Sequence, residues 1–236
     1  MPSFKTQNAL LLHVCALGEK SFLLSLFTPE KGRYIGVVKT KNRPDIASFV
    51  DARWQARLEE QIGSYYLDNI SSFAANFLDD KKRLSVISSV CELLHQLLPE
   101  RQTAKNLYTS TIDLLKHLST DMFLGNYLRW EVLLLSEIGF GLDFSKCAGG
   151  GNSNDLGYVS PKTGRAVSWE KGKPYHDKLL VLPRFLWCSN TSDISREDLL
   201  KGFVLTSYFL TEHAGLRHLP VAREQLVRYI LTEKTH

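Results

Sequence analysis

The sequence contains no long hydrophobic run. Although 44% of its 236 residues are hydrophobic, no apolar stretch reaches the roughly 18 to 20 residues that a membrane-spanning helix needs. The first apolar stretch, in MPSFKTQNALLLHVCALG, follows a lysine, as in a secretory signal. It contains His13, however, lacks a small-x-small cleavage site and precedes a segment that reads as its hairpin partner. We therefore expect neither a membrane helix nor a secretory signal, and a cytoplasmic location.

Cysteine is scarce, and the four residues stand singly, as Cys15, Cys91, Cys147 and Cys188. No two of them have the C-x-x-C spacing with which a turn holds a metal ion. Their density is also too low for a disulfide scaffold in a chain of this length. Cys15 and Cys91 have apolar neighbours in the sequence, so we expect both to be small core residues.

Catalytic motifs are also missing. The sequence has no His-Glu-x-x-His pair, no Gly-x-Ser-x-Gly elbow and no cysteine with an obvious histidine partner. The glycines at 149–151 lack the lysine of a phosphate-binding loop, and Gly139 and Gly141 supply only two glycines of a dinucleotide fingerprint. Asp143 and Asp155 fit Asx-turn or N-cap roles better than a catalytic pair. We predict no enzyme, no catalytic residue, no bound metal and no cofactor.

The first 70 residues have the pattern of short strands. Five apolar or alternating runs, separated by turn signals, are ALLLHVCAL, SFLLSLFT, YIGVVKT, FVDARWQARLEE and IGSYYLDNI. Five antiparallel strands are too few for an immunoglobulin sandwich and suit a small closed barrel. We therefore predict an α+β protein whose N-terminal domain, residues 1–79, is a five-stranded OB-fold.

Helical periodicity begins after residue 80. It predicts helices over 81–98, in TAKNLYTSTIDLLKHLS, in GNYLRWEVLLLSEIGFG, from Ser195 to about Gly215, and from about Val221 past Ile230. The third of these is apolar nearly all round, so its Trp130 is expected in the core. We predict a mainly helical domain over 80–236, with a loop- and strand-rich insertion around 143–184.

Basic residues are concentrated between positions 31 and 57. The segment has seven basic residues against only Asp45 and Asp51, whereas the whole chain has a net charge of +4. With Tyr34, Phe49 and Trp54 nearby, this composition is typical of a groove that follows a phosphate backbone. The alternative is a solvated strand face without a ligand. We predict as DNA-binding residues Lys31, Arg33, Lys39, Lys41, Arg43, Arg53 and Arg57.

Stretches along nearly the whole chain resemble the RecO family of bacterial recombination-repair proteins. In the family's order they are TPEKGRYIGVVKTKN, ARWQARLEEQIGSYYL, LLPERQTAKNLY, LRWEVLLLSEIGFGLDFSKC and GLDFSKCAGGGNSNDLGYVSPKTGRAVS. The resemblance implies an N-terminal OB-fold and a helical C-terminal domain. It also implies a nucleoid-associated mediator that binds single- and double-stranded DNA, anneals complementary strands and works with RecR to load RecA. The DNA in that step is covered by single-stranded-DNA-binding protein, whose C-terminal tail is a further implied partner.

Some members of the family have a four-cysteine zinc module in the region of the insertion. Here only Cys147 stands at such a position, and one thiolate cannot build a tetrahedral site. We therefore predict a zinc-less version of the module, anchored by buried Tyr158, Val159, Ala166 and Val167.

Two other functions stay open. One is a protein–protein adaptor that binds through its helical domain, and the other is a nuclease, which the absence of a carboxylate cluster disfavours.

Overall fold

The computed structural model describes residues 1–58, 60–188 and 193–232. Its contacts divide the chain into two compact units. The first comprises Met1–Ile112 and Pro220–Arg223, and the second Asp113–Leu219 and Glu224–His236. The predicted boundary between residues 79 and 80 stays a prediction. Within the described residues no helix is both long and apolar enough to cross a membrane.

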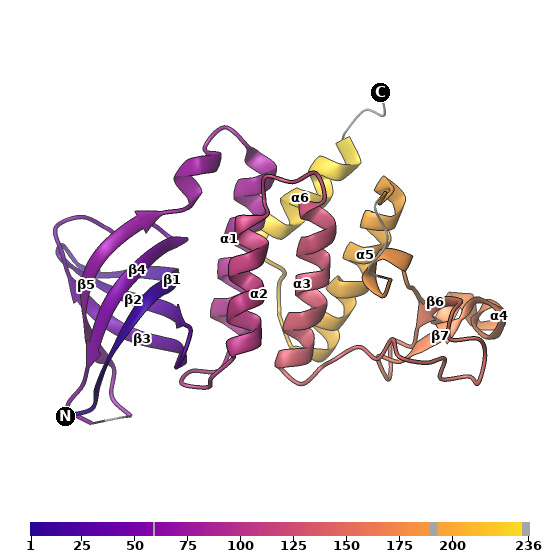
Figure 1. Ribbon diagram of the computed structural model, residues 1–236, viewed down its shortest axis with the longest axis horizontal. Coiled ribbons are helices and arrows are strands. Elements are labelled where there is room, and N and C mark those ends of the chain that lie inside the picture. Colours follow the sequence, from indigo (N-terminus) through magenta and orange to yellow (C-terminus); the bar gives the residue numbers. More distant parts are fainter. Residues whose placement is uncertain (59, 189–192, 233–236) are drawn as a thin grey trace. The chain divides into compact units, whose positions relative to one another are not determined.

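The N-terminal strands form a closed five-stranded barrel, as predicted (Figure 1). The strands pair in the order β1-β2-β3-β5-β4, and β4 pairs with β1 to complete the ring. The all-antiparallel arrangement that we expected is wrong for one pair, because β3 and β5 are parallel. A ring with an odd number of strands cannot alternate direction throughout. The strand bounds are Ser3–Gly18 (β1), Ser21–Thr28 (β2), Gly32–Lys39 (β3), Ser48–Gln55 (β4) and Gly63–Ser72 (β5).

The alternating pattern of β4 places Trp54 inside the barrel. Trp54 is buried among core residues contributed by all five strands, and its Nε1 donates to the carbonyl oxygen of Ile35 at 3.0 Å. Tyr65 of β5 is also buried, and its hydroxyl donates to the carbonyl oxygen of Tyr34 at 3.2 Å. These bonds satisfy the polar atoms of aromatic side chains that fill the core.

Helix α1 (Lys81–Leu97) packs on β1 in the first unit. The carboxylate of Asp80 caps the helix by accepting the backbone N–H of Arg83 at 3.0 Å. Leu10 and Leu12 of β1 are buried but do not belong to the core cluster inside the barrel. The middle of β1, residues 9–12, is therefore buried on both faces, which explains why its sequence there reads as a continuous apolar run rather than an alternating one. Cys91 of α1 is buried as predicted, whereas Cys15, in the exposed end of β1, is not.

The second unit contains α3 (Phe123–Glu137) and α5 (Arg196–Tyr208), which contact each other. Trp130 lies buried on α3, and Gly139, with a φ of +91°, follows the end of that helix. Ser195 caps α5 by accepting the backbone N–H of Asp198 at 3.1 Å. Elsewhere in the chain lie η1 (Ala74–Phe77), α2 (Lys105–Lys116), η3 (Arg184–Leu186), the π-helical turn η4 (Phe209–His213) and α6 (Val221–Thr232).

The predicted insertion is a three-stranded sheet with short helices. Its strands, β6 (Leu156–Val159), β7 (Ala166–Ser168) and β8 (Leu180–Val181), pair in the order β7-β6-β8. Helices α4 (Trp169–Gly172) and η2 (Lys173–Lys178) follow β7. The predicted anchors Tyr158, Val159 and Ala166 are buried. Val167 is only partly buried, because the alternation of β7 places it opposite to Ala166.

Candidate nucleic-acid interface

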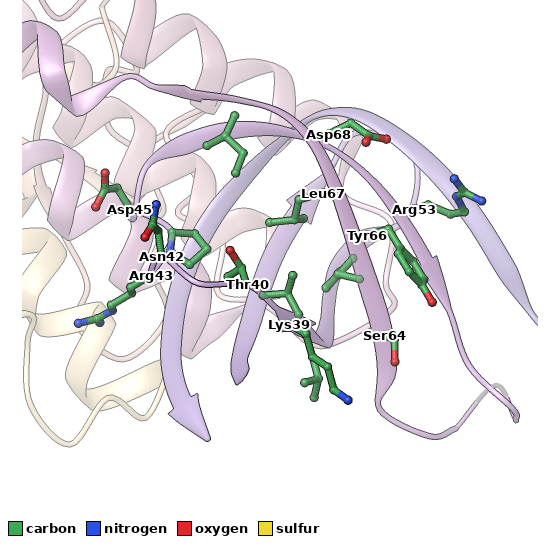
Figure 2. Close-up of a pocket in the computed structure, with 15 residues that line it drawn as sticks. Lys39, Thr40, Asn42, Arg43, Asp45, Arg53, Ser64, Tyr66, Leu67 and Asp68 are labelled. Atoms are coloured by element: carbon green, nitrogen blue, oxygen red, sulfur yellow. The ribbon is translucent and has the colours of Figure 1, made fainter. Parts of the chain in front are cut away.

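A groove of about 780 Å³ lies on the barrel, between β3, the loop that follows it, β4 and β5 (Figure 2). Segments up to about thirty residues apart in the sequence form its walls, because closure of the barrel brings β5 beside β3. The lining residues are Val37, Val38, Lys39, Thr40, Asn42, Arg43, Pro44, Asp45, Arg53, Ser64, Tyr65, Tyr66, Leu67, Asp68 and Ile70.

Three of the seven predicted cations line this groove. Lys39 ends β3, Arg43 lies in the β3–β4 loop, and Arg53 projects from β4; all three are exposed. One guanidinium nitrogen of Arg43 donates to the carbonyl oxygen of Val14 at 3.2 Å, which anchors the loop residue to β1. Lys41 is exposed in the same loop but is not among the residues that line the groove.

The structure places the other three predicted cations elsewhere. Lys31 is exposed in the turn between β2 and β3, and Arg57 is exposed just after β4. Arg33 points into the protein. Its Nε donates to the carbonyl oxygen of Leu98 at 2.7 Å, and its side chain is only 11% exposed beside Glu100. Burial lowers the pKa of Arg33, and the charge of Glu100 opposes that effect. Arg33 therefore holds the segment after α1 against the barrel instead of lining the groove.

Two carboxylates also line the groove, Asp45 and Asp68. With three cations and two carboxylates, the groove has only a small excess of positive charge, to which Lys41 beside it adds. Asp51, the other acidic residue of the basic segment, accepts hydrogen bonds from the backbone of Asn8 and the side chain of Asn69. These bonds lower the pKa of Asp51. The net charge of the groove by itself therefore predicts only a moderate affinity for phosphate.

Tyr66 is the aromatic side chain that is exposed in the groove, and it was not among our predicted site residues. The aromatics that we associated with the groove lie elsewhere. Tyr34 and Trp54 are buried in the barrel core, and Phe49 packs edge-on against Phe73, with ring centroids 6.0 Å apart. The alternation of β5 contains the signal that we missed: with Tyr65 directed inward, the adjacent Tyr66 must point outward.

The surroundings of Cys147 supply hydrogen-bond donors instead of further metal ligands. Its Sγ accepts the backbone N–H of Ser168 at 3.2 Å and lies 3.5 Å from the Ser168 hydroxyl. Burial raises the pKa of this thiol, but hydrogen bonds from Ser168, Gly151 and Gly149 outweigh that effect and lower the pKa to about 7. In the part of the chain that the structure describes, no cluster of three or more His, Cys, Asp or Glu side chains is placed to hold a metal ion. These residues do not fit a four-cysteine zinc site.

Comparisons with known proteins cover nearly the whole chain. Residues 78–221 match the family model described as "Recombination protein O C terminal". A DNA repair protein RecO from Rhodospirillum centenum is 41% identical over 233 residues, covering 94% of this chain and 92% of the relative. Proteins of the same name from Rickettsia canadensis and Jannaschia sp. are 39% and 38% identical, with at least 91% of each chain covered. The chain therefore belongs to the RecO family of DNA repair proteins.

Proposed function

We propose that this protein binds single- and double-stranded DNA through the barrel groove and acts as a recombination mediator. In this role it anneals complementary strands and helps to load RecA onto single-stranded DNA covered by single-stranded-DNA-binding protein. Its proposed partners are DNA, RecR and the C-terminal tail of single-stranded-DNA-binding protein. The proposed location is the cytoplasm, at the nucleoid. The function is non-catalytic: binding brings strands and proteins together, and no covalent bond is made or broken.

One observation carries the proposal: Lys39, Arg43 and Arg53 come from three separate segments and line one groove. Lys39 and Arg53 belong to strands of the barrel, so their backbone does not have to be ordered when phosphate binds, which lowers the entropy cost of binding. Phosphate contacts fix the position of a strand but do not distinguish its bases. Such a groove suits a mediator, which must bind DNA of any sequence.

The test measures DNA affinity against salt concentration, together with annealing of complementary strands with and without single-stranded-DNA-binding protein. We expect the variant Lys39→Gln, Arg43→Gln, Arg53→Gln to bind more weakly at low salt and to anneal more slowly. The slope of log K against log salt should flatten by about two units for single strands, because each lost phosphate contact removes roughly 0.7. The loss should be similar for unrelated DNA sequences.

A matched control replaces three exposed lysines of the second unit, Lys162, Lys173 and Lys178, with glutamine. It removes the same number of positive charges from the chain, so it should behave like the parent if the groove is the DNA surface. If the groove variant behaves like the parent while the control loses affinity, DNA binds outside the barrel. If the parent binds no DNA, the protein–protein adaptor replaces the mediator as the function.

A further inference from the structure

Tyr66 is held at the groove by two neighbours on β4. It is paired in register with Arg53, whose guanidinium carbon lies 5.8 Å from the centroid of the tyrosine ring. The side-chain amide of Gln55 donates to the Tyr66 hydroxyl at 3.2 Å. The residue nevertheless remains 51% exposed. An aromatic ring with a restrained orientation and an open surface can bind a flat partner without a large loss of side-chain entropy.

The groove that contains this ring also has apolar and hydrogen-bonding groups. Ile70, 55% exposed, lines the same groove with the partly buried Leu67, and Asn42 and Ser64 supply hydrogen-bonding groups. Lys39 and Arg53 are available for phosphates. Figure 2 shows the side chains of Tyr66 and Arg53 close together, with Ser64 on the same strand as Tyr66. The groove thus offers a stacking surface and charges, whereas a site for phosphate alone needs only the charges.

Resting on the proposed function, we infer that Tyr66 stacks with an unpaired base and makes the groove bind single strands in preference to duplex. A base in a duplex already stacks on its neighbours, so its face is not free to meet the tyrosine ring. A base in a single strand has a free face, and every base has one, so the contact does not depend on sequence. Arg53 supports the ring from β4 and carries the charge for the adjoining phosphate.

The test compares the parent and Tyr66→Ala on three probes of equal length: a single strand, the same strand with abasic sites throughout, and a duplex. Tyr66→Ala should lower affinity for the ordinary single strand about 5- to 150-fold, the range expected for one lost base–aromatic stack. It should leave affinity for the abasic strand and the duplex unchanged, because both keep the phosphates but offer no free base. The salt slope should not change either.

Two further variants identify the ring as the cause. Tyr66→Phe keeps the aromatic face and should bind nearly as the parent does, even without the hydrogen bond from Gln55. Tyr175→Ala removes a tyrosine of the second unit that is somewhat more exposed, at 60%, and should bind as the parent on all three probes. If Tyr66→Ala proves unstable in thermal melts, the parent alone still tests the inference, since it should bind the ordinary strand more tightly than the abasic one.

The inference is overturned if Tyr66→Ala weakens binding to all three probes equally, or if the parent does not distinguish the ordinary strand from the abasic one. In both cases the groove cations can still bind phosphate, so the proposed function stands. A parent that binds none of the three probes overturns the proposed function and the inference together. Loss of binding in the triple groove variant, with unchanged binding in Tyr66→Ala, supports the proposed function and rejects the stacking contact.

Discussion

Gly32, at the start of β3, lies directly against the segment after α1. Its φ is +74°, and a Cβ at this position would lie 1.8 Å from the carbonyl oxygen of Gln102. A side chain would therefore strain the backbone and push two segments of the first unit apart. We expect Gly32→Ala to lower the free energy of unfolding by about 2 kcal/mol or more, as strained and overpacked substitutions do.

Denaturant melts of Gly32→Ala and Gly18→Ala measure this effect. Gly18 ends β1 and has no atom within 4 Å of its hypothetical Cβ, so its replacement should change stability by less than about 0.5 kcal/mol. Equal stability of the two variants would show that the contact at Gln102 relaxes without cost.

Replacement of Cys147 shows whether the insertion depends on a bound metal ion. Because Ser168 and two glycine N–H groups already surround its sulfur, Cys147→Ser should keep most of these hydrogen bonds and lose about 1 kcal/mol of stability. Elemental analysis of the purified parent should show no stoichiometric zinc. One tightly bound zinc ion per chain, together with loss of folding in Cys147→Ser, would contradict this interpretation.

At the scale of the element, α3 organises the second unit around its aromatic side chains. Trp130 is 3% exposed and stacks with Tyr127, with ring centroids 6.0 Å apart and an interplanar angle of 21°. Trp130→Ala should lower the free energy of unfolding by about 3–5 kcal/mol, because the cavity that it leaves cannot collapse fully. Urea melts should show near-parent stability for Val204→Ala, an exposed position on α5. Near-parent stability of Trp130→Ala would instead mean that this side chain packs loosely.

The contact of β1 with α1 gives the first unit an acid-sensitive element. The rings of His13 on β1 and His95 on α1 stack with centroids 4.3 Å apart and nearly parallel planes. Burial, with smaller effects from the charges of His13 and Arg33, lowers the pKa of His95 from 6.5 to about 4. The unfolded chain therefore takes up a proton at a pH where the folded chain does not. The stability associated with neutral His95 is present above pH 6.5 and is lost as the pH falls towards about 4.

Thermal melts from pH 7.5 to pH 4.5 test this behaviour in the parent and in His95→Phe, which keeps an aromatic ring but has no titrating group. We expect the variant to lose less stability over this range than the parent, since His95 no longer contributes to proton uptake on unfolding. The control is His176→Gln, at an exposed position, which should follow the parent. Identical curves for all three proteins would exclude His95 as the source of acid sensitivity.

At the scale of the whole molecule, the barrel contacts residues beyond the predicted boundary at 79. Phe27 of β2 is fully buried and packs edge-on against Tyr108, with ring centroids 5.3 Å apart. The guanidinium of Arg101 lies 5.5 Å from the ring centroid of Tyr34 and 5.8 Å from that of Trp54. A fragment of residues 1–79 would lose these contacts and expose the apolar outer face of β1 to water.

We therefore expect a fragment of residues 1–112 to unfold cooperatively and a fragment of residues 1–79 to aggregate or to melt at a much lower temperature. Circular dichroism melts and size-exclusion chromatography of both fragments provide the measurement. Limited proteolysis of the full chain should accordingly spare residues 80–112. A stable, monomeric fragment 1–79 would support the shorter domain that the change in periodicity predicts.

The sequence by itself determined the features that depend only on the succession of neighbouring residues. Alternation in β4 and helical spacing from Lys81 onward indicated the barrel and the helices, because side-chain direction follows the period of the backbone. The family resemblance also needed only the order of residues. The concentration of basic residues between positions 31 and 57 could be counted without any structure.

Only the tertiary structure decided which of these residues meet. Arg33 and Arg53 carry the same charge and lie in the same segment of the sequence. Arg33 donates a hydrogen bond to the carbonyl oxygen of Leu98, whereas Arg53 lines the groove beside Tyr66. The parallel pairing of β3 with β5 was likewise hidden, because it arises from closing an odd-numbered ring and not from the pattern of either strand. A local pattern states which way a side chain points relative to its own strand. The groove exists because closure of the barrel brings distant strands together, and that closure depends on packing over the whole first unit.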